Sequence, residues 1–193
     1  MRSLHGRTRD ARGERGASMV EAAVVTPVVF AMLFGIMELG MLFKDYLGTQ
    51  AAIRAGVRIA SASPRNSTFA QLAANEVQAK SSVVNPTDFQ ELWVYKANAA
   101  NDFPSGRTDF GNCTVCVKFT WDTGTGTFRP SSDTWAASAQ NACTTAAGGP
   151  PDRIGVYAKV RHGAFTGVIP TTTIAEGTSM NLEPFPALSG CKP

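Results

Sequence analysis

Residues 22–43 read AAVVTPVVFAMLFGIMELGMLF, and this run decides the architecture of the chain. Its 22 residues contain one ionisable side chain, Glu38. As a helix rising about 1.5 Å per residue, the run is about 33 Å long, enough to cross a bilayer. A cleaved secretory signal has a shorter apolar region with a small-residue cleavage site close behind it, whereas ASAS at residues 60–63 lies too far away. We therefore expect a transmembrane helix, with a cleaved signal or the buried helix of a soluble protein as the alternatives.

The surplus of positive charge is confined to the residues before this run. The chain carries 18 Lys and Arg against 15 Asp and Glu. Residues 1–16 hold five arginines and two carboxylates, and removing these from the totals leaves 13 basic and 13 acidic residues. A basic cluster beside an apolar run is a topology signal rather than a nucleic-acid-binding surface. The positive-inside rule then predicts a cytoplasmic N-terminus and an exterior for the residues from about 44 onward.

The membrane helix is expected to continue outside the bilayer. Apolar residues recur at intervals of three or four after the run, at Leu47, Ala51, Ala55, Ile59 and Ala62. Pro64 then ends the helix, because the residue before a proline is pushed out of the helical region. The sequence thus predicts a basic leader over 1–16, a long helix over 17–62 with its span at about 22–43, and an exterior domain over 63–193.

The exterior domain is predicted to be α+β. A second helix is expected over 68–84, with Ser67 as its cap, because apolar residues share one face there. The period then changes to two, which predicts strands over 91–97, 114–121 and 153–162, with a last strand around 179–182. The stretches 122–133 and 144–152 read as long connections, and 133–143 as a short helix. Helices followed by strands favour a small, mainly antiparallel sheet.

Four cysteines lie in the exterior part, at Cys113, Cys116, Cys143 and Cys191. An even number in an oxidising compartment predicts two structural disulfides. All three pairings are possible, and we prefer Cys113 and Cys116 each joined to Cys143 or Cys191, since neighbours this close are strained to pair. The Cys-x-x-Cys spacing alternatively suggests a redox motif or zinc, but no second such pair supplies the remaining zinc ligands.

No motif in the sequence points to catalysis. There is no GxSxG, no glycine-rich phosphate loop before a helix and no clustered pair of carboxylates. His162 ends a predicted strand without a nucleophile nearby and is expected at a surface or turn, while Trp93, Trp121 and Trp135 are expected in the core. We expect no enzyme activity, cofactor, metal or small-molecule substrate.

Residues 15–61, RGASMVEAAVVTPVVFAMLFGIMELGMLFKDYLGTQAAIRAGVRIAS, resemble the N-terminal module of TadE-like proteins, the pseudopilins of tight-adherence (Flp, type IVc) pilus systems. The matching positions are Arg15, Gly16, Glu21, Pro27, Phe34, Gly35, Ile36, Glu38, Arg54, Gly56 and Arg58. A weaker likeness to the ends of such proteins covers residues 154–170 and SMNLEP at 179–184. The middle of the chain, from about 63 to 152, shows nothing specific to the family.

The resemblance implies processing and assembly roles for the start of the helix. It places a prepilin peptidase cut between Gly16 and Ala17 and assigns Glu21 to pairing with the new amine, in the same subunit or a neighbour. Such pairing offsets the cost of a carboxylate in lipid, about 2.5 to 3.5 kcal/mol for an aspartate at mid-bilayer and less near the interface. The alternative is that Glu21 only sits in the first turn at the interface, favoured by the helix dipole.

Three further features of the helix each have two interpretations. Pro27 either kinks or locally melts the helix during packing, or is a tolerated membrane proline. Glu38 either reaches outward to the interface or meets a partner helix, since intramembrane carboxylates are costly without partners. Ala31 and Gly35 form a small-xxx-small pair that permits close helix approach, although such residues are common in any span.

The sequence as a whole predicts a single-pass protein of the cytoplasmic membrane with an extracytoplasmic C-terminal domain, and the resemblance implies a location in or at the base of a surface pilus. By resemblance, it is a minor pilin or pseudopilin whose partners are the prepilin peptidase, the pilus platform proteins and the major and minor pilins. Two alternatives remain, a signal-anchored cell-surface binding protein outside any filament and a type II secretion pseudopilin.

Overall fold

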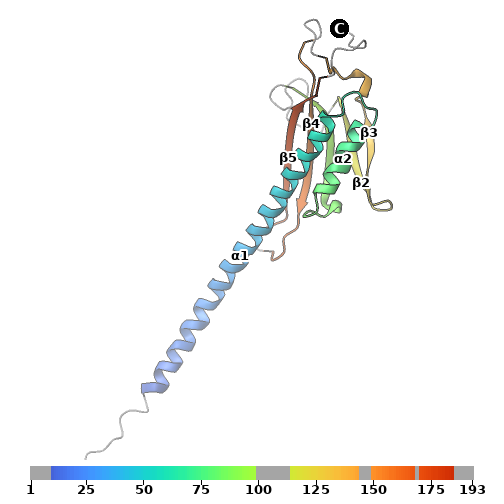
Figure 1. Cartoon of the computed structure of the whole chain (residues 1–193). Coiled ribbons are helices and arrows are strands. Elements are labelled where there is room, and N and C mark those ends of the chain that lie inside the picture. Colours follow the sequence, from blue (N-terminus) through green and yellow to red (C-terminus); the bar gives the residue numbers. More distant parts are fainter. Residues whose placement is uncertain (1–9, 99–113, 144–148, 168–169, 185–193) are drawn as a thin grey trace, which may run out of the picture.

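The computed structural model describes residues 10–98, 114–143, 149–167 and 170–184, with side chains from residue 16 onward. The helices are α1 (Asp10–Ser61) and α2 (Phe69–Lys80), with short 3-10 turns η1 (Pro86–Asp88) and η4 (Ala137–Ala139). The strands are β1 (Phe89–Ala97), β2 (Cys116–Asp122), β3 (Thr127–Asp133), β4 (Arg153–His162) and β5 (Thr172–Asn181). A long apolar helix, a second helix and a sheet follow in that order (Figure 1), so the predicted α+β class is confirmed.

The described strands form one antiparallel sheet in the order β3-β2-β1-β4-β5. Central strand β1 pairs Leu92 with Phe119 of β2 on one side and with Ala158 of β4 on the other. Strands β3 and β5 are therefore the two edges of the sheet. Strand β5 pairs along the whole of β4, from Arg153 opposite Asn181 to His162 opposite Thr172.

The connection predicted over 122–133 is wrong, because Thr127–Asp133 is strand β3. It forms a hairpin with β2 around a turn in which Asp122 Oδ1 accepts a hydrogen bond from the Gly124 amide at 2.8 Å. Phe128 is the one buried residue of the strand, so β3 has almost none of the apolar alternation that marks a strand in sequence. Pro130 is tolerated because β3 is an edge.

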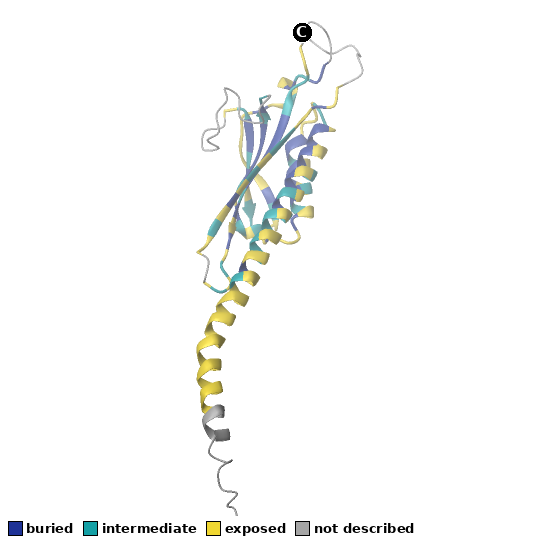
Figure 2. Cartoon of the chain, turned by 90° about the vertical axis from the view of Figure 1, so that its left-hand side faces the viewer, coloured by how far each residue is buried: buried dark blue, intermediate teal, exposed yellow. Residues whose placement is uncertain are grey.

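Helices α1 and α2 cover one face of the sheet, with α1 against β4 and β5 and α2 against β3 and β1 (Figures 1 and 2). The core between them takes alternate residues of each inner strand, and the prediction for β4 is confirmed, with Ile154, Val156, Ala158 and Val160 buried. Trp93, Tyr95 and Tyr157 form a smaller cluster on the opposite face. Trp135 is buried and Trp121 packs against the core, as predicted.

Small residues let α2 approach α1 closely. They recur at every fourth position of α1, at Gly48, Ala52, Gly56 and Ala60. A Cβ at Gly56 would lie 2.6 Å from Val77 Cγ2 and 3.1 Å from the Ala73 carbonyl oxygen. The larger apolar residues that mark the helical period, such as Leu47 and Ile59, lie instead on the exposed side.

Several predicted boundaries of the other elements differ from the structure. Helix α2 ends at Lys80 rather than Val84, and Ser67 does not cap it; Asn66 Oδ1 instead accepts from the Thr68 amide at 2.9 Å. The short helix expected over 133–143 is only the 3-10 turn η4. The last strand begins at Thr172, seven residues before the predicted start at 179.

Candidate functional site

The lower half of α1 projects from the domain as an apolar stalk, which we define as residues 16–37. Every described side chain of the stalk is exposed except the half-buried Gly35 (Figure 2). Large apolar side chains are among the most exposed, including Met19 at 76% and Ile36 at 68%. By length and composition, α1 is a helix that could span a membrane. The stalk and the point where it enters the domain are the candidate functional site.

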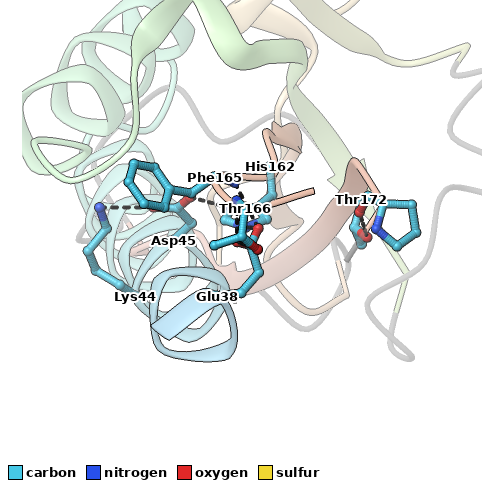
Figure 3. A network of polar contacts seen from close by, with 8 residues as sticks. Glu38, Lys44, Asp45, His162, Phe165, Thr166 and Thr172 are labelled. Carbon is cyan, nitrogen blue, oxygen red and sulfur yellow. Dashed lines mark hydrogen bonds and ion pairs between the residues drawn. The ribbon is translucent and has the colours of Figure 1, made fainter. Parts of the chain in front are cut away.

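The stalk meets the domain at Glu38, which is fully buried. One carboxylate oxygen accepts a hydrogen bond from the Phe165 amide, and the other accepts from the amide and the hydroxyl of Thr166, each at 2.9 Å. All three donors belong to the connection between β4 and β5, more than 120 residues away in sequence. Figure 3 shows Thr166 and His162 gathered over the Glu38 carboxylate at the helix surface.

His162, the last residue of β4, is buried beside this carboxylate, so its predicted place at a surface or turn is wrong. Its Nδ1 lies 2.7 Å from Asp45 Oδ2, two turns above Glu38 on α1, and its Nε2 lies 3.9 Å from Glu38 Oε1. Lys44 Nζ in turn lies 3.4 Å from Asp45 Oδ1 (Figure 3). The histidine thus stands between two carboxylates that α1 presents seven residues apart, on one face of the helix.

These contacts join the helix to the sheet at the base of the domain. Glu38 was expected to reach outward or to meet a partner helix, but its carboxylate is bound within its own chain. Charge-assisted hydrogen bonds from backbone amides hold a carboxylate more strongly than neutral ones do. The site is therefore suited to fixing the orientation of the stalk relative to the domain. Within the described residues, no group of three His, Cys, Asp or Glu side chains is arranged to hold a metal.

The other residues predicted to act in processing and assembly all lie on the stalk. Gly16, Ala17 and Glu21 are exposed in helical backbone, and no described side chain of the domain covers them. The helix runs unbroken through Pro27 (Figure 1), so the local melting considered for it is absent from this state of the protein. Their roles in processing and assembly stay predictions.

Ala31 and Gly35 lie seven and three residues before Glu38, on the face of α1 that meets the sheet higher up. A Cβ added at Gly35 would meet nothing within 4 Å. The small-xxx-small pair therefore has no partner among the described residues, and its open surface is free to accept another helix.

The cysteines are placed only in part. Cys116, at the start of β2, and Cys143 are buried, and both are disulfide-bonded. Cys113 and Cys191 lie outside the described residues. The two-bridge arrangement and its pairing therefore stay predictions.

A groove of about 480 Å³ runs between α1 and edge strand β5, above the stalk. Leu42, Phe43 and Tyr46 line its helical wall, and residues 173–176 line its strand wall. Phe43 is 63% exposed at its mouth. The apolar surface of the stalk therefore continues onto the lower part of the domain.

Residues 16–58 match the family model described as TadE-like protein. The searches of curated proteins and of solved structures gave no match. The matched segment contains the stalk, Glu38, Gly48, which faces Val83 just after α2, and Gly56, which faces α2 itself. The predicted resemblance to TadE-like proteins is confirmed for this segment. The match supports an association of this protein with a tight-adherence pilus.

Proposed function

From the TadE-like identity of residues 16–58, we propose that this chain is a minor pilin or pseudopilin, a structural and non-catalytic component of a tight-adherence (Flp, type IVc) pilus. Its stalk crosses the cytoplasmic membrane, with the basic leader in the cytoplasm and the α+β domain outside. Its partners are the prepilin peptidase, the pilus platform proteins and the other pilins. The alternatives are a surface binding protein outside any filament and a type II secretion pseudopilin.

The observation that carries this proposal is the division of α1 into two halves. The upper half is built into the core of the domain through Ala52, Ile53 and Val57, while the stalk exposes apolar side chains all round. A helix that is apolar all round must be covered by lipid or by other helices. The apolar surface of the stalk can contact lipid or other helices. A subunit that first resides in a bilayer and then packs into a filament needs both kinds of contact.

Glu21 is the one ionisable residue of the stalk, and its place in the helix suits the assembly role. It lies four residues after Ala17, so the two residues are neighbours on one face of α1, about 6 Å apart along the axis. A cut after Gly16 would leave the new amine of Ala17 one turn from the carboxylate. Pairing with this amine, or with that of a neighbouring subunit, would neutralise both charges as the helix leaves the membrane surface.

The proposal is tested by replacing Glu21 in a host that carries the pilus genes. We expect Glu21→Ala to leave the protein in the membrane fraction but to remove it from sheared filaments, because membrane insertion depends on the apolar stalk and assembly depends on the carboxylate. Glu21→Asp, which keeps the charge, should restore part of the filament signal. The measurement is an immunoblot of the membrane and sheared fractions.

Glu76→Ala is the matched control, because Glu76 is also a helical carboxylate but lies on α2, away from the stalk. This variant should assemble like the unmodified protein. Normal incorporation of the Glu21→Ala protein would show that the role assigned to this carboxylate is wrong. Absence of the unmodified protein from sheared filaments would favour a surface protein that never enters a filament.

A further inference from the structure

The structure defines the position on α1 at which the exposed stalk ends and contact with the domain begins. Following the helix from residue 16, Glu38 is the first buried side chain. Its carboxylate fixes the backbone of Phe165 and Thr166, so the connection between β4 and β5 reaches down to this same level. Phe165 and Thr166 are thus held by α1 at the point where the stalk begins, and Figure 3 shows Thr166 beside the Glu38 carboxylate.

The length of the stalk matches the thickness of a bilayer. Residues 17–37 span 21 positions, about 31 Å of helix, against a hydrocarbon core of about 30 Å. The boundary expected at Phe43 would instead sink residues 38–43, about 9 Å of helix, into the hydrocarbon. The irregular backbone at Phe165 and Thr166 would then enter lipid, where exposed polar backbone is not tolerated.

Phe165 has the features of an interfacial anchor. Its amide is held by Glu38 at 2.9 Å, yet its side chain is 70% exposed. The Phe165 ring has no partner in the described core. Because its backbone is fixed, the exposed ring is available to contact an apolar surface outside the protein. Phenylalanine is among the side chains with which proteins that lie at a membrane surface enter the boundary between headgroups and acyl chains, to a depth of about 5–10 Å.

The charges near this level are already paired within the protein. The Nζ atom of Lys44 lies 3.4 Å from Asp45 Oδ1, and Nη2 of Arg161 lies 3.4 Å from Asp88 Oδ1. Among the described residues, the base of the domain therefore offers no unpaired basic cluster that would select anionic headgroups. The exposed side chains of Phe165 and Phe43 at this level are apolar, so their fit to a membrane depends on the depth of the bilayer surface rather than on its charge.

We propose that Phe165, on the backbone that Glu38 fixes, inserts into the outer interface of the bilayer and sets the depth at which the protein sits. The span is then residues 17–37, with Glu38 at its outer boundary and the domain resting on the membrane. This inference depends on the proposed membrane anchoring, since without a spanning stalk the ring has no bilayer at its level.

The test places tryptophan probes in the full chain and reconstitutes it into vesicles of phosphatidylethanolamine and brominated phosphatidylcholine. The bromines lie either near the glycerol backbone or near the centre of the bilayer. Phe165→Trp should lose more fluorescence with the shallow bromines than with the deep ones, after subtraction of the signal from the unmodified chain. Since Phe165 is largely exposed, the replacement leaves the core intact, which near-UV circular dichroism checks.

Two further variants separate the inference from the anchoring on which it depends. Val28→Trp reports the middle of the stalk and should be quenched most by the deep bromines. Ile59→Trp is the control, because Ile59 is 38% exposed and about 31 Å further along α1 than Glu38, so its signal should not change. Replacing phosphatidylethanolamine by phosphatidylglycerol should leave the Phe165→Trp result unchanged.

If Val28→Trp is quenched and Phe165→Trp is not, the helix spans the bilayer but the ring does not reach it, and the inference is overturned. If Val28→Trp is not quenched either, the anchoring itself is wrong and the inference falls with it. Deep quenching of Phe165→Trp would also contradict the boundary at Glu38.

Discussion

Gly56 is the point at which the packing of α2 on α1 is most sensitive to a single added carbon. In Gly56→Ala the new Cβ would lie 2.6 Å from Val77 Cγ2, closer than real Cβ contacts come, and 3.1 Å from the Ala73 carbonyl oxygen. Val77 is fully buried and β-branched, so its methyl group has little freedom to move aside. The helices must separate slightly or Val77 must leave its rotamer.

The size of the effect follows from two opposing terms. Overpacking of a core costs about 1–3 kcal/mol. Alanine is more favourable than glycine in a helix interior by about 1 kcal/mol. We therefore expect Gly56→Ala to lower the free energy of unfolding by up to about 2 kcal/mol.

Removing the colliding methyl groups should reverse the sign of this change. In a Val77→Ala background, the clash with Cγ2 is gone, and only the closer approach to the Ala73 carbonyl remains. Gly56→Ala should then be neutral or stabilising by up to about 1 kcal/mol. The cycle is measured by guanidinium unfolding of the full chain in detergent, followed by the fluorescence of its three tryptophans, of which Trp135 meets the ring of Phe69 of α2 edge-on with 5.3 Å between ring centroids.

Gly40→Ala is the matched control, since it lies on the same helix and its Cβ would meet nothing within 4 Å. It should not destabilise the domain. If Gly56→Ala stabilises the unmodified protein, or if the two backgrounds give the same change in the free energy of unfolding, the contact with Val77 is not what disfavours a larger residue at position 56.

Three further predictions concern the rest of the domain. Gly155→Ala should lower the melting temperature, because its Cβ would collide with the buried ring of Tyr95; an unchanged melting curve would contradict this contact. Glu38→Leu should speed hydrogen exchange of the Thr166 amide more than Thr166→Val does, since the second change removes only the hydroxyl donor; equal exchange in the two variants would contradict the assigned bonds. Reduction of the disulfides should lower the free energy of unfolding by about 2–4 kcal/mol per bridge, and identical unfolding with and without reductant would argue against a stabilising role.

Elements that follow a local period could be predicted from the sequence. The apolar run of α1 and the core-facing set of β4, Ile154, Val156, Ala158 and Val160, depend only on neighbours in the chain, and both predictions are confirmed. Strand β3 could not be found in this way. As an edge strand it buries only Phe128, so its sequence has the composition of a loop.

The contacts of Glu38 could not be predicted from the sequence either. Its donors come from a connection more than 120 residues away, and their approach depends on how β4 and β5 lie against α1. The spacing of Glu38 and Asp45 placed both carboxylates on one helix face, which was the available signal. Because Glu38 lies within the apolar run of 22–43, the sequence alone points to a membrane position for it and not to His162 as its neighbour.

The mass of the mature N-terminus tests most directly whether this chain is processed and assembled as a pilin-type subunit. The protein is extracted from the membranes of its own host and its N-terminal peptide is measured by mass spectrometry. We expect a chain that begins at Ala17, because the cut after Gly16 frees the amine proposed to pair with Glu21. An intact start at Met1 or Arg2 in protein that has reached the membrane would contradict this.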